Sequence, residues 1–549
     1  MIDLNQLFPY RFDPKYSKPV AYFSMEFAVD QALKIYSGGL GFLSGSHLRS
    51  AYELKQNFIG IGILWKYGYY DQTRNMDGTL KASFVEKNYS FLEDTGIVFP
   101  IRIHNHEVKV KAMLLRPEVF NTAPLFLLTT NLPENDHLAQ TISHRLYDSH
   151  ESARIAQSSL LGYGGAKLLD ILNRETEVYH LNEGHALPLC FYLWEKYKRL
   201  EEVKKRVVFT THTPELAGNE EHDAGRLEVM SFFDGVSKSD YQQLIEPGSK
   251  NLNSTLAALR MSKLANGVSK LHGKVSNDMW ANYSGICKIT SITNAQNHTY
   301  WQDAKLEKAF EKEEMEKALA RKKEMKRELF RVVADQCGKL FDENALTIVW
   351  ARRFAGYKRA NLLLNDMERF FRIINKPGMP VQVIWAGKPY PEDHGSIDMF
   401  NDIHAKTKSM PNCAILTGYE LALSGLLKGG SDVWLNNPKI YREASGTSGM
   451  SAAMRGSVNL SIPDGWVPEF AKHGKNSFCI EAVDQSLEEK ERNKIEAARI
   501  YDVLEQEVVP TYYKKPEKWF RIMTQAWADV KEGFDSNRMA REYYEILYK

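Results

Sequence analysis

The sequence predicts an α/β protein built from parallel strands and helices. Short apolar runs rich in β-branched residues recur along the chain, longer helical stretches separate them, and their apolar character is continuous rather than alternating. Continuous apolar runs are typical of parallel strands that are covered on both faces. Strands that alternate with helices indicate an α/β architecture.

Strands are expected at five places, and helices dominate two others. The expected strands are 207–211, 347–351, 381–386, 432–435 and 458–462. Residues 303–333 are rich in Lys, Glu, Arg, Ala and Met, with opposite charges three and four positions apart. This pattern predicts a long, mostly solvated helical segment. Large apolar side chains recur at helical intervals in 516–549, which predicts core-facing helices that close the structure.

These features predict four parts of the chain. They are an amino-terminal lobe at 1–300, a helical connector at 301–342, a carboxy-terminal lobe at 343–515 and the closing helices at 516–549. A chain of 549 residues has room for two to four domains.

Composition excludes several classes of protein. The 71 basic and 69 acidic side chains give a net charge of +2, which offers no argument for nucleic acid or an anionic membrane as partner. Five scattered cysteines show no metal-ligand spacing and fit free thiols in a reducing compartment. No run approaches the ~20 apolar residues of a membrane span, and the first residues lack the apolar stretch of a secretory signal. We expect a cytoplasmic protein without a metal site.

A glycine-rich turn is the first motif with chemical meaning. Tyr36-Ser-Gly-Gly-Leu-Gly places Gly38, Gly39 and Gly41 before a segment, 43–54, that is expected to be helical. Glycines let backbone amides approach an anion, and a helix N-terminus adds about half a positive charge. A tight turn that serves only packing explains the same pattern.

A cation cluster follows one of the expected strands directly. Ala351-Arg-Arg-Phe-Ala-Gly-Tyr-Lys-Arg holds four cations in eight residues. Ligands of open α/β sheets bind at the carboxyl ends of strands, and Arg and Lys both suit phosphate. The alternative is a solvated basic turn.

A second candidate anion site follows Asp432-Val-Trp-Leu-Asn-Asn-Pro. In Glu443-Ala-Ser-Gly-Thr-Ser-Gly-Met, small residues again open an expected helix at 451–455. Glu443 is placed to accept hydrogen bonds from hydroxyl groups. Two small-residue turns and a cation cluster together suit a phosphorylated or diphosphate-linked sugar, although each alone could be structural.

Histidines form the fourth group, in His180-Leu-Asn-Glu-Gly-His and Thr210-Thr-His-Thr-Pro. His212 follows an expected strand, although a lone histidine is commonly a structural group. His180 and His185 are five residues apart, which does not match the i, i+4 pairing of a helical zinc site.

Together these motifs resemble the short bacterial and archaeal α-glucan phosphorylases. The resemblance rests on ordered matches from about Tyr22 to Trp466, and they include Tyr22-Phe-Ser-Met-Glu-Phe and Leu271-His-Gly-Lys-Val-Ser besides the motifs above. It implies the GT-B fold, with two Rossmann-like lobes, an acceptor side and a donor or phosphate side, and a cleft between them. It also implies a retaining glucosyl transfer in which pyridoxal phosphate is held by a lysine.

The resemblance implies a role for each matching residue. Arg353 and Lys358 are implied to bind the substrate phosphate, and Arg352 and Thr447 to lie near the cofactor phosphate. The backbone amides of Gly38, Gly39 and Gly41 are implied to face the anion. The resemblance also implies that the hydroxyl groups of the sugar are bound by Asn294, Glu443, Ser445 and Gly446, and that His212 lines the glucosyl site. Arg353, Lys358 and His212 are the expected catalytic residues.

Two positions depart from the family pattern. Ser451 stands where the family has its cofactor lysine, and a hydroxyl forms no imine with an aldehyde. Arg455, one turn later, replaces a common asparagine and is expected to face the emptied pocket as an added phosphate-binding cation. Asn297 stands at the expected histidine of Thr293-Asn-Ala-Gln-Asn-His, which weakens any inference about the acceptor.

Three explanations follow from these departures. The favoured one is a transferase that uses a nucleotide-diphosphate sugar, carries no covalent pyridoxal phosphate and needs no other cofactor. The second is a phosphorylase that releases glucose 1-phosphate with non-covalent pyridoxal phosphate, or one in which the lysine was engineered out, although the altered neighbours argue against a single engineered change. The third is an inactive glucan-binding module. The expected partners are a donor with a phosphate or diphosphate group and a carbohydrate acceptor. The oligomeric state stays open, since family members are often dimers or larger.

Overall fold

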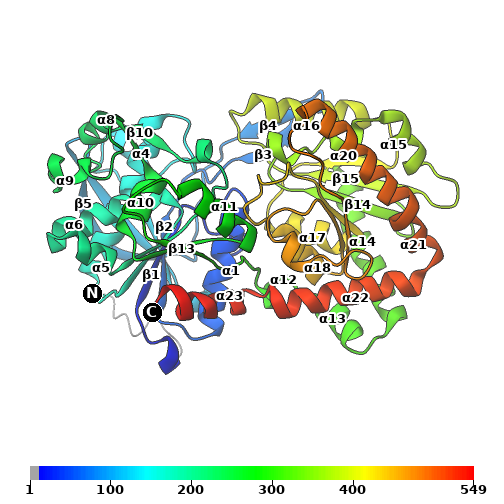
Figure 1. Ribbon diagram of the computed structural model, residues 1–549, viewed down its shortest axis with the longest axis horizontal. Coiled ribbons are helices and arrows are strands. Elements are labelled where there is room, and N and C mark those ends of the chain that lie inside the picture. The colour runs from blue at the N-terminus through cyan, green and yellow to red at the C-terminus, as the bar shows by residue number, and fades with distance from the viewer. Residues whose placement is uncertain (1–11) are drawn as a thin grey trace. The chain divides into compact units, whose positions relative to one another are not determined.

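The computed structural model describes residues 12–549, and they form two compact units (Figure 1). Unit 1 contains residues up to Tyr70, then Phe84–Asn294 and Ser536–Lys549. Unit 2 contains Asp71–Ser83 and Ala295–Asp535.

Unit 2 has a six-stranded sheet whose strands are all parallel. Its order is β16-β15-β14-β17-β18-β19. The strands are β14 (Leu346–Ala351), β15 (Val381–Ala386), β16 (Cys413–Leu416), β17 (Val433–Asn436), β18 (Val458–Ser461) and β19 (Ser477–Cys479). Numbered along the chain, this order is 3-2-1-4-5-6, the arrangement of a doubly wound nucleotide-binding sheet. The strand order reverses between β14 and β17.

Both faces of this sheet are buried, which explains the continuous apolar runs. In β14, Val349 and Ala351 join one core with α14, α17 and α18, whereas Ile348 and Trp350 join a second core on the other face. The helices of unit 2 are α12 (His298–Trp301), α13 (Ala304–Glu311), α14 (Met315–Cys337), α15 (Met367–Ile374), α16 (His394–Thr407), α17 (Leu421–Gly430), α18 (Ser448–Met454), α19 (Val467–Phe470), α20 (Glu489–Val503), α21 (Val509–Lys514) and α22 (Pro516–Gly533).

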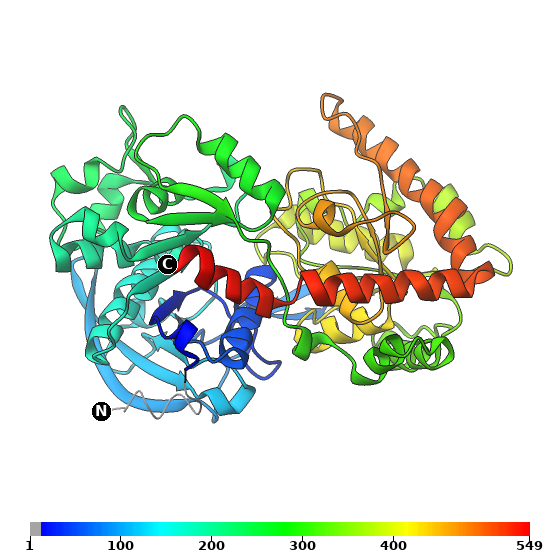
Figure 2. The ribbon, with the colours of Figure 1, turned by 60° about the horizontal axis from the view of Figure 1, so that its bottom comes forward.

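Unit 1 has a nine-stranded sheet with the same kind of reversal. Its order is β13-β12-β9-β8-β1-β2-β7-β6-β5. In this sheet β6 pairs antiparallel with both β7 and β5, and β5 and β6 form a long edge hairpin (Figure 2). The strands are β1 (Val20–Phe23), β2 (Phe58–Ile63), β5 (Glu93–Ile103), β6 (His106–Leu115), β7 (Leu125–Thr129), β8 (Val178–Asn182), β9 (Val207–Thr210), β12 (Leu264–Gly267) and β13 (Lys288–Ser291). Its strand order reverses between β1 and β8.

Helices and one small sheet complete unit 1. They are α1 (Gly39–Glu53), α2 (Pro117–Phe120), α3 (His137–Thr141), α4 (Glu151–Ser159), α5 (Gly165–Ile171), α6 (Pro188–Tyr197), α7 (Leu200–Lys204), α8 (Ala224–Val229), α9 (Lys238–Gln242), α10 (Ser254–Met261), α11 (Lys270–Trp280), α23 (Ser536–Glu542) and the pair β10 (Glu221–Asp223) and β11 (Asn251–Asn253). Two doubly wound units of this kind confirm the predicted α/β, GT-B class of fold.

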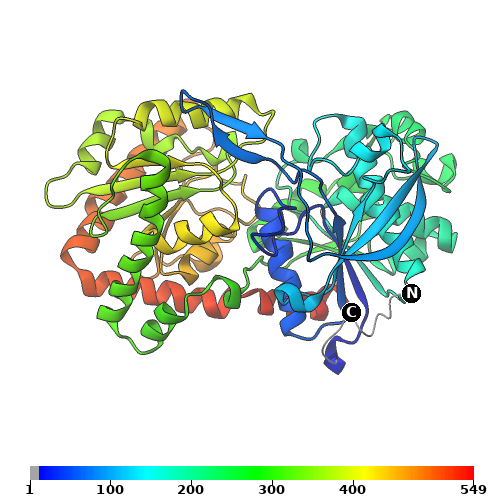
Figure 3. The ribbon, with the colours of Figure 1, turned by 180° about the vertical axis from the view of Figure 1, so that it is seen from behind.

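A hairpin of early sequence belongs to unit 2. β3 (Asp71–Arg74) pairs with β4 (Leu80–Ser83), and Figure 3 shows this hairpin beside α16. The Gln72 amide donates to Gly387 O at 2.8 Å, and its Oε1 accepts from Gly418 N at 3.0 Å. These contacts join segments more than three hundred residues apart, so no local sequence pattern predicted this crossing.

The predicted charged helical segment forms two helices, α13 and α14. One face of α14 is buried, although the segment was expected to be mostly exposed to solvent. Lys322 and Lys326 are only 3% and 1% exposed. Lys322 Nζ donates to Gly429 O at 2.6 Å and to Ser431 O at 2.8 Å, so it satisfies carbonyls at the end of α17. Burial lowers the pKa of Lys322 to about 7. Lys326 Nζ lies 2.6 Å from Asp432 Oδ2, so the expectation of a mostly solvated segment does not hold for these two lysines.

The closing segment divides between the units. Trp519, Phe520, Met523 and Trp527 of α22 are buried in unit 2, as the apolar spacing predicted. In α23 and the residues after it, Tyr548 Oη lies 2.7 Å from His180 Nδ1 of β8, within unit 1. Within residues 12–549, no helix is long and apolar enough to cross a membrane.

Candidate functional site

The predicted phosphate-binding cations of unit 2 lie where its strand order reverses. Arg352 and Arg353 follow β14 directly, and the loop that carries Glu443 follows β17. Loops at this point of a doubly wound sheet diverge to opposite faces and leave a crevice between them. The topology therefore brings the second and third sequence motifs to one place.

Glu443 is surrounded by three cations. Lys358 Nζ lies 2.6 Å from Glu443 Oε2, and both side chains are 12% exposed. Burial acts to raise the pKa of Glu443, but the charge and hydrogen bond of Lys358 and the charges of Arg352 and Arg353 lower it overall. The carboxylate is therefore ionised inside a cluster whose net charge is positive. Such a cluster suits an anionic ligand that carries hydroxyl groups.

Arg352 and Arg353 differ in their surroundings. Arg352 is buried, and its guanidinium donates to Asn436 Oδ1 and, at 2.6 Å, to Leu435 O. Its Nε is buried without a protein acceptor. Arg353 is exposed. Arg352 is thus anchored to β17, and Arg353 is the cation of the pair that solvent reaches.

The loop from Glu443 to Thr447 has the geometry of a ligand cradle. Ser445 is 5% exposed, and its Oγ has no hydrogen-bond partner among residues 12–549. Gly446 has φ +72°, a conformation that glycine adopts without strain. Thr447 precedes α18, and its side chain makes no capping hydrogen bond there. A buried hydroxyl without a partner is costly, and a sugar hydroxyl could satisfy it.

Ser451 is fully buried inside α18. Its hydroxyl is 3.4 Å from Thr447 O and 3.3 Å from Ser448 O, so it bonds back to its own helix. The helix begins at Ser448, three residues before the expected start. Within the protein, Ser451 therefore acts as a small packing residue.

Arg455, Lys428 and Trp301 lie together where α12, α17 and α18 meet. Arg455 Nε donates to Trp301 O at 2.7 Å, and its Nη1 donates to Gly425 O at 3.3 Å. Lys428 is fully buried, with Nζ 3.5 Å from the centre of a Trp301 ring. Burial, and then the charge of Arg455, lowers the pKa of Lys428 well below its usual range. The guanidinium of Arg455 is thus held by backbone carbonyls, and the buried position of Lys428 was not predicted.

In unit 1, the glycine turn is held by a buried carboxylate that sequence reasoning missed. Glu26 Oε2 accepts from Ser37 N at 2.6 Å and from Gly38 N at 3.1 Å. A Cβ on Gly41 would lie 2.8 Å from the same oxygen, whereas Cβ atoms on Gly38 and Gly39 would meet nothing within 4 Å. The amide of Gly38 is therefore committed to Glu26, and the open side of the turn lies at Gly38 and Gly39.

His212 is a neutral, oriented side chain in unit 1. Its Nε2 lies 2.7 Å from Asn182 Oδ1, and because the Asn182 amide donates to Ser24 Oγ, the imidazole is the donor. Burial lowers the pKa of His212 to about 3. Its backbone N donates to Glu183 Oε2 at 2.7 Å. At neutral pH, His212 can accept at Nδ1 but carries no acidic proton to transfer.

Glu183 and Asn294 complete the polar groups in this unit. Glu183 has φ +71°, which is strained for a residue with a Cβ. Asn294 is 4% exposed, and its Oδ1 has no protein donor. Asn297, in unit 2, accepts from Tyr300 N at 2.9 Å as the cap of α12, so this departure from the family pattern has a structural use.

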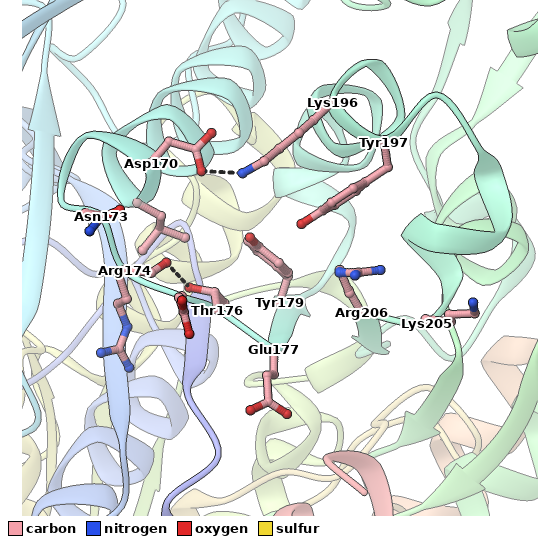
Figure 4. Close-up of a pocket in the computed structure, with 12 residues that line it drawn as sticks. Asp170, Asn173, Arg174, Thr176, Glu177, Tyr179, Lys196, Tyr197, Lys205 and Arg206 are labelled. Carbon is pink, nitrogen blue, oxygen red and sulfur yellow. Dashed lines mark hydrogen bonds and ion pairs between the residues drawn. The ribbon is translucent and has the colours of Figure 1, made fainter.

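A surface pocket of about 640 Å³ lies elsewhere on unit 1. It opens at the amino ends of β8 and β9, and Figure 4 shows Lys196 reaching Asp170 beside Tyr179 and Tyr197. None of the predicted site residues lines it. Among the described residues, no group of three or more His, Cys, Asp or Glu is placed to hold a metal ion.

Comparison with known proteins gives the family. The carbohydrate phosphorylase model matches residues 234–506. Maltodextrin phosphorylase of Thermococcus litoralis is 34% identical over 597 residues, which cover 97% of this chain and 71% of the relative. Glycogen phosphorylase of Aquifex aeolicus is 31% identical over 612 residues, 98% of this chain and 87% of the relative. An uncharacterized protein of Methanocaldococcus jannaschii is 46% identical over 534 residues, 97% of this chain and 100% of the relative. This chain therefore belongs to the carbohydrate phosphorylase family.

Proposed function

We propose that the protein is a retaining glucosyltransferase that takes its phosphate from the donor, a nucleotide-diphosphate glucose, and uses no covalently held pyridoxal phosphate. The observation that carries the proposal is the contrast within unit 2. The cluster of Arg352, Arg353, Lys358 and Glu443 is fully assembled, whereas position 451 offers only a buried hydroxyl.

Pyridoxal phosphate held through position 451 does not fit these residues. The Ser451 hydroxyl forms no imine and is bonded to its own helix. The neighbouring space at α12 and α17 contains the side chains of Trp301, Lys428 and Arg455.

The proposed chemistry is electrostatic. The bond between glucosyl C1 and the donor phosphate breaks, an acceptor hydroxyl bonds to C1 on the same face, and the hydroxyl proton passes to the leaving phosphate oxygen. Arg353 and Lys358 stabilise the charge on that oxygen, an effect worth roughly 10²–10³ in rate per preorganised donor. Lys358 has three N–H groups, so it can hold Glu443 and a phosphate oxygen together.

Glu443 and Ser445 bind the sugar in this proposal. The Glu443 carboxylate accepts hydrogen bonds from sugar hydroxyls, and Ser445 Oγ gains the partner that the protein does not supply. In this proposal unit 1 is the acceptor side, and it contributes Gly38, Gly39, His212 and Asn294. Thr447 and Arg455 keep their proposed place near the phosphate group, although the guanidinium of Arg455 must then exchange a carbonyl for the ligand.

A second candidate is an α-glucan phosphorylase that releases glucose 1-phosphate with non-covalent pyridoxal phosphate. The names of the relatives favour it, since they include maltodextrin and glycogen phosphorylases. The same cations would bind inorganic phosphate in such an enzyme. A glucan-binding module without catalysis is the third candidate, and the assembled charge cluster argues against it because purposeless buried charges are costly.

A thermal-shift panel tests the proposal. The ligands are nucleotide-diphosphate glucoses, glucose 1-phosphate, inorganic phosphate and maltodextrin, applied to the wild type and to Lys358→Met. We expect a nucleotide sugar to stabilise the wild type and not the variant, with no pyridoxal band in the absorbance spectrum. A pyridoxal band with stabilisation by glucose 1-phosphate alone favours the phosphorylase, and stabilisation by maltodextrin alone favours the module.

A further inference from the structure

Asp464 is a buried carboxylate directly beneath the loop that carries Glu443. It follows β18 and is 1% exposed. Its Oδ2 accepts from Glu443 N at 2.9 Å and from Arg442 N at 3.1 Å, and its Oδ1 accepts from Gly465 N at 2.9 Å. One side chain thus fixes the backbone at Glu443 and the turn that supports it.

The turn at Gly465 also contacts the loop that carries Glu443, at the backbone of Ser445. Trp466 N donates to Ser445 O at 3.0 Å. Gly465 has φ +59°, and a Cβ built on it would lie only 2.1 Å from Ser445 O. The segment 464–466 therefore holds both Glu443 and Ser445 by their backbones, and only glycine permits this approach.

We propose that Asp464 is a positioning residue for sugar recognition, which sets the Glu443 carboxylate among its three cations and Ser445 beside it. This role rests on the proposed function, in which Glu443 and Ser445 bind hydroxyl groups of the donor. Asp464 itself has no place in contact with the ligand.

The chemistry of the site favours a dedicated role for this carboxylate. A second carboxylate close to Glu443 is unfavourable, and burial together with the charge of Glu443 raises the pKa of Asp464 to about 6. A neutral asparagine has only one acceptor oxygen and would place an amide donor against one of the backbone N–H groups. Only a carboxylate accepts from all three amides.

The test compares Asp464→Asn with Asp393→Asn. Asp393 holds Ser396 N at 3.0 Å at the start of α16, so its variant removes a similar carboxylate contact from the same unit. Amide hydrogen exchange at residues 442 and 443 is measured first, without any ligand. We expect exchange there to accelerate at least about tenfold in Asp464→Asn and to stay unchanged in Asp393→Asn. Equal exchange in the wild type and Asp464→Asn overturns the positioning role.

Calorimetry with two kinds of probe then separates the two proposals. Inorganic phosphate reports the cations, and glucose 1-phosphate and nucleotide-diphosphate glucose report the sugar contacts. Asp464→Asn is expected to weaken the sugar-bearing ligand about tenfold or more and to leave phosphate affinity unchanged. A wild type that binds no sugar-bearing ligand contradicts the proposed function, whereas a variant that binds it as tightly as the wild type contradicts the role of Asp464 alone.

A second variant guards against misfolding. Gly465→Ala keeps the carboxylate but forces the turn away from Ser445 O. It is expected to weaken the sugar-bearing ligand and to spare phosphate, as Asp464→Asn does. If a folded Gly465→Ala protein binds the sugar-bearing ligand as tightly as the wild type, the segment 464–466 does not position Glu443 and Ser445 for sugar binding.

Discussion

Lys358 Nζ lies 2.6 Å from Glu443 Oε2, so a residue predicted to bind phosphate is paired with a residue predicted to bind the sugar. Both side chains are largely buried, and Arg352 and Arg353 add their charges to the same carboxylate. The pair helps to keep Glu443 ionised, and in the proposed function it would link recognition of phosphate to recognition of hydroxyl groups.

Lys358→Met is expected to lower turnover by roughly 10²–10³-fold, because it removes a preorganised cation from the leaving group. It also leaves Glu443 buried without its strongest counter-charge, so the free energy of unfolding should fall by about 3 kcal/mol and the pKa of Glu443 should rise. Turnover assays and urea unfolding measure the two effects. The double variant Lys358→Met/Glu443→Gln should recover much of the stability but not the turnover.

The matched control for this prediction is Lys406→Met. Lys406 pairs with Asp402 at 2.7 Å on the surface of α16, with side chains 45% and 44% exposed. Surface pairs contribute about 0–1 kcal/mol, so both readouts should stay close to the wild type. Equal losses in Lys358→Met and Lys406→Met would refute a special role for Lys358.

Ser445→Ala should separate stability from binding. The Ser445 hydroxyl is buried without a protein partner, so its removal should leave the free energy of unfolding unchanged or raise it by up to about 1 kcal/mol. Donor affinity should fall about tenfold, because the hydroxyl is the proposed sugar contact. Thermal unfolding and calorimetry report the two effects, and a variant that is destabilised with normal affinity contradicts the assignment.

Ser451 variants test whether the serine has any role beyond packing. Ser451→Ala removes only the bonds to Thr447 O and Ser448 O, so stability should change by less than about 1 kcal/mol and turnover should be unaffected. Ser451→Lys places a long cation in a fully buried position and should destabilise α18 by about 2 kcal/mol or more. A Ser451→Lys protein that is as stable as the wild type and takes up pyridoxal phosphate would show that the cofactor space is open.

Acid should destabilise unit 1 through its buried histidines. Burial lowers the pKa of His47 to about 3 and that of His272 to about 4, from a usual 6.5, and His180 lies well below its usual range. Because these folded-state pKa values are depressed, the unfolded state binds more protons below pH ~6.5, and stability is lost as the pH falls toward the folded values. Each histidine contributes up to about 1.4 kcal/mol per pH unit in that window.

Chemical unfolding at pH values between about 7 and 5 measures this slope. His47→Phe provides the comparison, since the imidazole is stacked on Tyr543 and lies against Phe58, where a phenyl ring fits. The variant should lose less stability on acidification than the wild type. Stability that does not change with pH over this range would contradict the prediction.

The strands and motifs of the site could be predicted from the sequence, but the side chains that hold its loops in place could not. β14 and β17 were recognised from their apolar runs, and the motifs after them meet because strand order fixes which loops are neighbours. The contacts of Asp464 with Glu443 and of Glu26 with the glycine turn were not predicted. Their partners are set by the approach of separate loops, which no local pattern encodes.

The charge pattern was misleading at one place. Lys322 and Lys326 lie in the segment that was expected to be mostly solvated, yet tertiary packing turns them toward carbonyls and Asp432. Arg455 directly follows α18, its guanidinium donates to Trp301 O, and its place in the phosphate site stays a prediction. Side-chain direction at a helix end depends on the neighbouring helices, which are not visible in the sequence.

Phosphorus NMR of the reaction mixture distinguishes a donor that supplies its own phosphate from a reaction that consumes inorganic phosphate. The protein, free of added pyridoxal phosphate, is incubated with maltodextrin and either nucleotide-diphosphate glucose or inorganic phosphate. We expect release of nucleoside diphosphate in the first mixture and no glucose 1-phosphate in the second. Glucose 1-phosphate formed from maltodextrin and inorganic phosphate, with no release of nucleoside diphosphate, would contradict it.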